Sequence, residues 1–418
     1  MKQEGSNDRS SVLKTMLPGL AVGAAALALA AVLAVESASA PARFVALLFL
    51  LLSLPAMALA VSGGIVLRRL RRAELGATDL FLESNESRRE AALERPGGFR
   101  SGSLRRLAAR AMLGHDFVVG DAVEIRSLGE IQATLDERGC LDGLPFQPEM
   151  VRFCGRQGQV FRSIDKIYDY GRTRLMRRLR GCVLVSGLRC DGAEHAGCEA
   201  RCYMIWKTEW LRRPGERRAP VGRGASPAPT RVTERAADGV ERERFLCQFT
   251  ELHAASKPMV PWEIGKELRP LVAGNVTLRT WIVGLATRYF NFAQRWRGGT
   301  GFPSLPRVDK ASSVVEAVPL VPGDKVVVRP IVEIAGTLND KGKHRGLWFD
   351  PDQIKHCGKP RTVLARVDRI IDDAHGQMLA MKTPCILLEG VDYSGEVLNF
   401  NAQQDLFFWR EVWLEKKS

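Results

Sequence analysis

The segment Gly120-Asp121-Ala122-Val123-Glu124-Ile125-Arg126 occurs again, in altered form, as Gly323-Asp324-Lys325-Val326-Val327-Val328-Arg329. With a constant shift of 203 residues, positions 120–211 align with 323–414 without a gap, and 26 of these 92 positions are identical. An ungapped match of this length indicates two copies of one domain.

Each copy has the pattern of a β domain. Short apolar or alternating runs follow Gly-Asp turns at 121–126 and 325–329, and further runs occur at 160–167, 182–185, 363–371 and 385–388. Short strands separated by Gly and Pro turns are typical of a small barrel or sandwich. We therefore expect a mainly β fold with two tandem SH3-like barrels, at 116–213 and 301–418.

Length and composition limit the class of protein. A chain of 418 residues is long enough for two or three folded units. A hydrophobic fraction of 45% with 26% charged residues excludes a wholly disordered chain. The small number of long apolar runs excludes a polytopic transporter. We find no complete catalytic motif and expect a protein that is not an enzyme and has no small-molecule substrate.

Two long apolar runs precede the repeats. Residues 17–35 and 44–67 contain 19 and 24 residues without a charge, and each could span a hydrocarbon core about 30 Å thick. Arginines follow the second run at 68, 69, 71 and 72. This pattern predicts a transmembrane hairpin within residues 1–72, with both ends on the cytoplasmic side of a bacterial inner membrane. A helical or irregular connector is expected at 73–115.

A signal peptide is the alternative for the first run. Ser37-Ala38-Ser39-Ala40 resembles a small-residue cleavage site. In either case the arginines after residue 67 would keep the remaining chain in the cytoplasm. The nine cysteines are then expected to be thiols or metal ligands rather than disulfides.

Residues that both copies share need only a common fold to explain them. Their cysteines and tryptophans are expected in the core: Cys154 and Cys357, Cys182 and Cys385, Trp206 and Trp409, Trp210 and Trp413.

The first copy alone carries a cluster of cysteines around one histidine. The members are Cys190, His195, Cys198 and Cys202, and Cys247 also has no counterpart in the second copy. Four soft or borderline ligands within 13 residues suit Zn²⁺, whereas four thiolates suit an iron–sulfur cluster. In the second case His195 would not be a ligand. The sequence leaves open zinc, iron–sulfur or free thiols.

Between the copies the pattern changes twice. Residues 214–243 are rich in Pro, Gly, Arg and Glu, which predicts a flexible linker. Residues 244–300 are expected to be helical, with an amphipathic helix at 276–297 that carries Trp281, Tyr289 and Trp296 on its apolar face. That face could pack on the barrels or lie on anionic lipid.

A basic strip lies in the first copy. It consists of Arg172, Arg174, Arg177, Arg178 and Arg180. The strip could be a solvated surface or a binding surface for anionic lipid or an acidic protein. Nucleic acid is a weaker alternative, because no reader motif is visible.

Several motifs resemble a family of bacterial proteins without assigned function. They are Gly143-Leu144-Pro145-Phe146-x-Pro148-Glu149-Met150, Phe153-Cys154-Gly155, Leu188-Arg189-Cys190-Asp191-Gly192, Gly197-Cys198-x3-Cys202-x3-Trp206-Lys207 and Cys247-Gln248. The likeness covers most of 116–300 and, more weakly, 320–415. It implies that the cysteine cluster and Cys247 act together. The apolar hairpin is a departure from shorter members of that family.

Two hypotheses of function follow. In the first, the chain is an anchored accessory or scaffold subunit of a larger membrane complex, respiratory or photosynthetic by analogy, whose barrels bind integral membrane subunits. In the second, it is a tethered metal or iron–sulfur redox protein. A membrane-attached nucleic-acid binder is the third and weakest.

Overall fold

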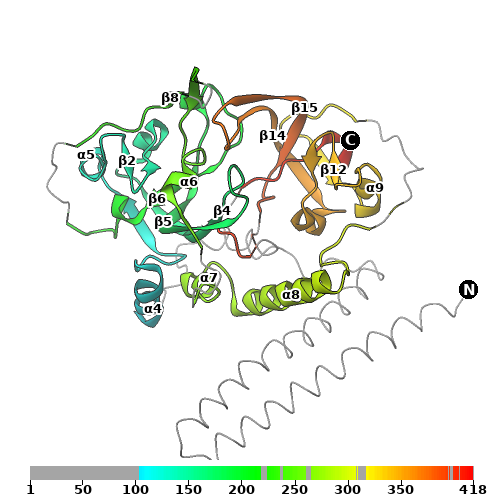
Figure 1. Ribbon diagram of the computed structural model, residues 1–418, viewed down its shortest axis with the longest axis horizontal. Helices are drawn as coiled ribbons and strands as arrows, with labels where there is room; N and C mark the ends of the chain where they lie inside the picture. Colours follow the sequence, from blue (N-terminus) through cyan, green and yellow to red (C-terminus); the bar gives the residue numbers. More distant parts are fainter. Residues whose placement is uncertain are drawn as a thin grey trace, which may run out of the picture. The chain divides into compact units, whose positions relative to one another are not determined.

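The computed structural model describes residues 103–217, 224–235, 239–259, 265–306, 308, 317–393, 395, 399–403 and 405–417. These residues are mainly β, and the two repeats lie in one compact unit (Figure 1). The helix α8 (Leu278–Trp296) belongs to a second unit.

The first repeat consists of short helices, one six-stranded sheet and a separate two-stranded sheet. In chain order, its elements begin with α4 (Ser103–Leu113), β1 (Ala122–Ile125), α5 (Leu128–Gln132), β2 (Cys140–Leu141), β3 (Leu144–Pro145), η2 (Pro148–Phe153), and the two long strands β4 (Gln157–Tyr168) and β5 (Met176–Arg189). They are followed by η3 (Ala193–His195), β6 (Tyr203–Lys207), η4 (Thr208–Trp210) and β7 (Leu211–Arg212). The strand order is β10-β5-β4-β1-β7, in which β10 (Lys257–Pro258) comes from a later segment, and β6 pairs with β5. The two-stranded sheet is formed by β2 and β3.

The segment after β7 returns to the first repeat. It contains β8 (Arg231–Arg235), β9 (Glu241–Phe245), α6 (Leu252–Ala255), β10 (Lys257–Pro258) and α7 (Arg269–Ala273). β10 pairs with β5, and Phe249 and Leu252 join the core of the first repeat. Residues 244–258 therefore complete the first repeat.

The second repeat has the same order of elements, displaced by 203 residues at β1 and β11, except that its described residues contain no counterpart of η3 and β6. The elements are β11 (Lys325–Val328), α9 (Ile331–Gly336), β12 (Lys343–His344), β13 (Leu347–Trp348), η5 (Pro351–His356), β14 (Pro360–Ile371), β15 (Met378–Leu388), η6 (Glu411–Trp413) and β16 (Leu414–Lys416). The strand order β15-β14-β11-β16 repeats β5-β4-β1-β7.

Curvature in both sheets comes from irregular pairing at equivalent places. The register between β4 and β5 shifts at Val160/Arg162 and Ile164/Lys166. The register between β14 and β15 shifts at Val363/Ala365 and Val367/Arg369. Extra residues in one strand bend it and increase its twist. Each long hairpin therefore curls around its own core.

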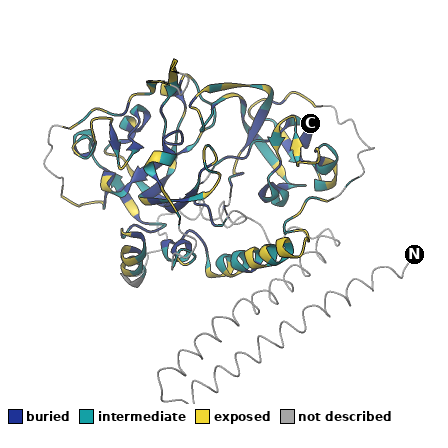
Figure 2. Cartoon of the chain, in the orientation of Figure 1, coloured by how far each residue is buried: buried dark blue, intermediate teal, exposed yellow. Residues whose placement is uncertain are grey.

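Two tryptophans fill the core of each half-barrel. Trp206 and Trp210 in the first repeat and Trp409 and Trp413 in the second are completely buried. Figure 2 shows that buried residues run along the strands of both repeats. Trp210 donates to Thr134 Oγ1 at 3.1 Å, and Trp413 donates to Thr337 Oγ1 at 2.9 Å. Removing such a side chain typically costs about 3–5 kcal/mol, so these four residues are major contributors to folding.

The structure corrects the predicted fold class. A transmembrane hairpin is not supported, since no helix in the described part of the chain combines the length and apolar character that a membrane crossing requires. The apolar runs at 17–35 and 44–67 lie outside the described residues. The repeats are half-barrels rather than closed SH3-like barrels. In the first repeat β6 pairs with β5 and β7 pairs with β1, and the described strands include no pairing between β6 and β7.

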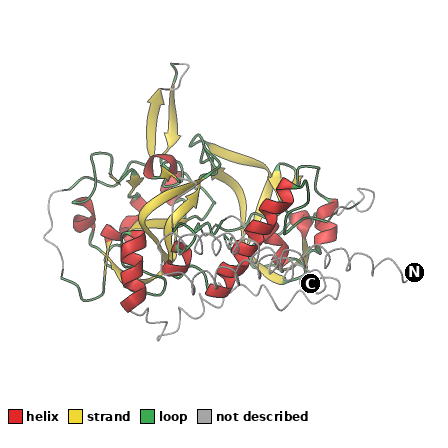
Figure 3. Cartoon of the chain, turned by 60° about the horizontal axis from the view of Figure 1, so that its bottom comes forward, coloured by secondary structure: helices red, strands yellow, loops and turns green. Residues whose placement is uncertain are grey.

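The segment expected to be a linker also contains regular structure. β8 pairs with β9 over five residue pairs, and the hairpin projects from the first repeat (Figure 3). Arg231 forms an ion pair with Glu243 at 3.2 Å and lies over the Phe245 ring. Charged residues in the segment that was predicted to be a flexible linker therefore pair across two strands.

Candidate metal centre

The cysteine cluster lies on a loop between β5 and β6. Cys190 follows β5 directly, and its N–H donates to the Cys202 carbonyl at 2.8 Å, which closes the loop. Gly192 has a φ of +71°, and a β-carbon there would lie 1.9 Å from the Cys198 carbonyl oxygen. Only glycine fits this position, so the loop's shape depends on Gly192.

The predicted ligands gather around one cavity. A space of about 40 Å³ is lined by all five of them, namely Cys190, His195, Cys198, Cys202 and Cys247. Cys247 comes from the segment after β9, and Gln248 holds that segment on β6. The Gln248 side chain accepts the Ile205 N–H at 2.8 Å and donates to the Ile205 carbonyl at 2.8 Å.

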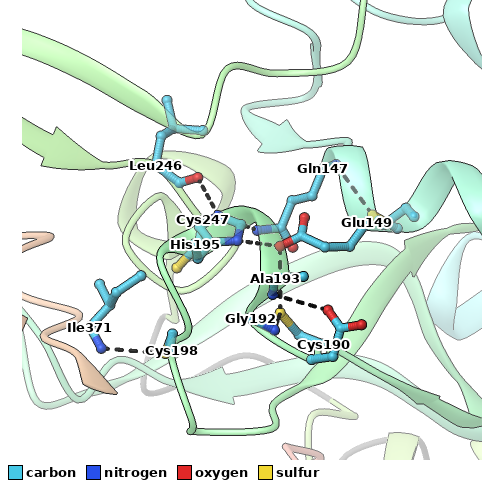
Figure 4. Close-up of polar contacts among 12 residues, drawn as sticks. Gln147, Glu149, Cys190, Gly192, Ala193, His195, Cys198, Leu246, Cys247 and Ile371 are labelled. Carbon is cyan, nitrogen blue, oxygen red and sulfur yellow. Dashed lines mark hydrogen bonds and ion pairs between the residues drawn. The ribbon is translucent and has the colours of Figure 1, made fainter. Parts of the chain in front are cut away.

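A buried histidine–carboxylate pair lies beside the cavity (Figure 4). His195 Nδ1 contacts Glu149 Oε1, and Glu149 also lies 3.8 Å from the Cys190 sulfur. His195 Nε2 lies 3.1 Å from the Leu246 carbonyl oxygen. Both ring nitrogens therefore have partners, and His195 joins η2 to the segment that carries Cys247.

Glu149, Cys190 and His195 form a group that could hold a metal ion. Their ligand atoms all lie within 4.8 Å of one another. Burial lowers the pKa of His195, but the contact with Glu149 outweighs it and raises the pKa overall. Glu149 was not predicted as a ligand, because the second copy has another acidic residue, Asp352, at the equivalent position, and only residues without a similar counterpart stand out in the sequence.

The cavity suppresses ionisation of its thiols. Desolvation and the nearby Glu149 raise the pKa of Cys190 to about 12, and desolvation raises that of Cys247 to about 12. The pKa of Cys202 is raised in the same way. A metal that binds these sulfurs would therefore have to displace their protons.

The second repeat also lines the cavity. Ile371, at the end of β14, donates its N–H to the Cys198 sulfur at 3.4 Å. Asp373 lies on the cavity wall, and desolvation together with Asp405 raises its pKa to about 7. Ile371 and Asp373 belong to the second copy and approach the cavity only when the repeats dock, so the pattern of the first copy does not indicate them.

The predicted basic strip is not one surface. Arg172, Arg174 and Arg180 are exposed, but Arg177 is buried. Its guanidinium donates to Ser256 Oγ and to the Ser256 carbonyl, both at 2.7 Å. Arg178 lies 3.5 Å from Asp165. Alternation along β5 divides the strip.

The remaining predicted surface residues lie on α8. Trp296 and Tyr289 are exposed, at 87% and 42%, and Trp281 is half-buried. The expectation that this helix contacts lipid stays a prediction.

Comparison of the chain with protein-family models, with curated proteins and with solved structures finds no match. The resemblance noted in the sequence is therefore untested, and the candidate site rests on its own geometry.

Proposed function

We propose that the chain is an iron–sulfur redox protein whose cluster is held by the thiolates of Cys190, Cys198, Cys202 and Cys247. The observation that supports the proposal is the convergence of these four side chains on one cavity of about 40 Å³. Four thiolates are the usual ligand set of [2Fe–2S] and [4Fe–4S] clusters.

The donor set supports the cluster. Four of the five predicted ligands that line the cavity are cysteines, and both ring nitrogens of His195 already contact protein groups. A set of four thiolates is therefore complete without the histidine.

His195 and Glu149 would support this cluster without binding it. Their contact joins η2 to the loop of Cys190, and His195 also contacts the Leu246 carbonyl beside Cys247. Groups that orient ligands in this way typically change metal affinity about 10–100-fold when they are removed. Variants of His195 are therefore expected to weaken the centre rather than abolish it.

A mononuclear zinc site is the second candidate. It is favoured by the group of Glu149, Cys190 and His195, whose ligand atoms all lie within 4.8 Å of one another. In that site His195 would exchange one of its present contacts for the metal. Cys198, Cys202 and Cys247 would then be free thiols.

The test is anaerobic purification of the full chain, followed by measurement of iron, acid-labile sulfide and zinc. We expect iron and acid-labile sulfide, visible absorbance, and reversible bleaching of that absorbance with dithionite. Cys198→Ser, Cys202→Ser and Cys247→Ser should each lose the iron. Cys154→Ser, outside the cavity, is the matched control and should retain it.

The outcomes separate the candidates. Zinc that is lost in Glu149→Gln and His195→Gln but retained in Cys198→Ser and Cys247→Ser would overturn the cluster in favour of the zinc site. A folded chain that contains neither metal would overturn both. The interpretation as a scaffold subunit stays a prediction from the sequence.

A further inference from the structure

The two repeats dock through equivalent segments. Cys198 Sγ accepts the Ile371 N–H at 3.4 Å, and Asn401 Oδ1 accepts the Tyr168 N–H at 3.2 Å. The shift of 203 residues relates Cys198 to Asn401 and Tyr168 to Ile371. Each repeat thus offers the end of its long strand to the loop of the other.

A second pair of contacts follows the same rule. The Glu199 N–H donates to the Arg369 carbonyl at 3.1 Å, and the Ala402 N–H donates to the Lys166 carbonyl at 3.5 Å. Residues 199 and 402 are equivalent, as are 166 and 369. Contacts that occur in reciprocal pairs define a two-fold relation, as in an isologous dimer interface.

The two halves of this interface differ in chemistry. On one side the acceptor of the strand-end N–H is the sulfur of Cys198, which lines the cavity. On the other side it is the amide oxygen of Asn401. The cysteine side has an additional contact, since Glu199 Oε2 accepts the N–H groups of Asp368 and Arg369 at 2.6 and 3.1 Å.

We infer that residues 368–373 of the second repeat are part of the metal centre, so that metal binding and local docking of the repeats are one linked equilibrium. This inference rests on the proposed function. It assigns to the second repeat the role of closing a site whose ligands all come from the first.

The physical basis is the hydrogen bond to the Cys198 sulfur. A sulfur bound to iron carries more negative charge than a free thiol and accepts an N–H more strongly. Because a ligand stabilises the state that binds it better, loading of the centre should hold Ile371 in place. The Tyr168 contact ends on a neutral amide and should not respond to metal. The chain therefore contains its own reference contact.

Hydrogen–deuterium exchange of the full chain tests this linkage. The metal-loaded form and the form stripped anaerobically with a chelator are compared. We expect the amides of Asp368, Arg369 and Ile371 to exchange several-fold more slowly in the loaded form. The Tyr168 amide should exchange at the same rate in both.

A variant tests the reverse direction. Glu199→Ala removes the acceptor of the Asp368 and Arg369 amides but leaves every proposed ligand, so it should bind metal and release it several-fold faster to a chelator. Glu194→Ala, an exposed position in the same loop, is the control and should release metal at the unaltered rate.

The failures are distinguishable. If iron is present but the Ile371 and Tyr168 amides respond alike to its removal, and Glu199→Ala releases metal at the normal rate, the linkage is wrong and the iron–sulfur proposal stands. If the chain holds no metal, the proposed function fails and the linkage fails with it.

Discussion

Arg189 and Asp392 occupy equivalent positions in the two repeats, 203 residues apart, and form an ion pair with each other at 2.8 Å. Equivalent residues can meet only close to the two-fold axis that relates the copies. The pair is mostly buried, with 20% and 11% of the two side chains exposed. The Arg189 guanidinium also lies over the Tyr203 ring, 3.7 Å from its centre.

This pair is expected to couple the repeats energetically. Arg189→Gln and Asp392→Asn should each lower the free energy of unfolding, and the double variant should lose less than the sum. We expect a coupling energy of about 0.5–3 kcal/mol, the range for residues in direct contact. Chemical denaturation of the four forms measures it, and strictly additive losses would contradict the contact.

Gly192 should be essential for the cysteine loop. A β-carbon at Gly192 meets the Cys198 carbonyl oxygen, whereas at Gly187, with a φ of +72°, nothing lies within 4 Å. Gly187→Ala is expected to cost only the strain of the left-handed backbone, about 1–2 kcal/mol. Gly192→Ala must also move the loop and should lose bound metal. Equal metal content in the two variants would show that the loop tolerates the change.

Gln248 should stabilise the segment that carries Cys247. Gln248→Leu leaves the N–H and carbonyl of Ile205 without their side-chain partner inside the core, at an expected cost of about 1–3 kcal/mol. The midpoint temperature of thermal unfolding and the metal content should both fall. Gln377→Leu is the control, because Gln377 is exposed and surface substitutions usually change stability by less than about 0.5 kcal/mol. Similar losses in the two variants would contradict the assignment.

His356 should make the second repeat sensitive to acid. Burial, reinforced by the charges of Lys355 and Arg361, lowers its pKa from 6.5 to about 2. Between these values the unfolded chain binds a proton that the folded chain does not, so stability falls as the pH decreases from 6.5. The contribution of this one proton is about 1.4 kcal/mol per pH unit.

The first repeat provides the matched variants for this test. Phe153 is equivalent to His356, and each ring contacts the equivalent tryptophan, Trp206 or Trp409. His356→Phe should reduce the acid dependence of unfolding, and Phe153→His should increase it. Denaturation at pH 7 and pH 5 measures both. An unchanged difference between the two pH values in His356→Phe would refute the prediction.

Local pattern was sufficient for some features of this chain. The ungapped repeat predicted equivalent strands, and the shared tryptophans Trp206 and Trp409 are buried as expected. The sequence grouped Cys190, Cys198, Cys202 and Cys247, which have no cysteine counterpart in the second copy, and the structure places these four on one cavity. These features depend on how far apart residues lie along the chain within one repeat, and that spacing can be read from the sequence.

Features that depend on docking could not be predicted in this way. Ile371 and Asp373 reach the cavity only because two copies meet around an axis. The sequence predicted Arg177 as one member of a basic strip, but in the structure β10 pairs with β5 beside it and Arg177 is buried. The apolar length at 17–35 predicted a membrane hairpin, but length and composition alone do not establish one.

The reciprocal contacts between the repeats have an evolutionary consequence. In a homodimer of one repeat, every substitution would appear on both sides of the axis at once, and a cysteine could not be lost from one face alone. Joining the copies in a single chain removes that restriction. Asn401 can then replace the counterpart of Cys198 while the hydrogen bond across the axis is kept. Fusion thus allows one half to carry a cysteine and the other an amide at the same contact.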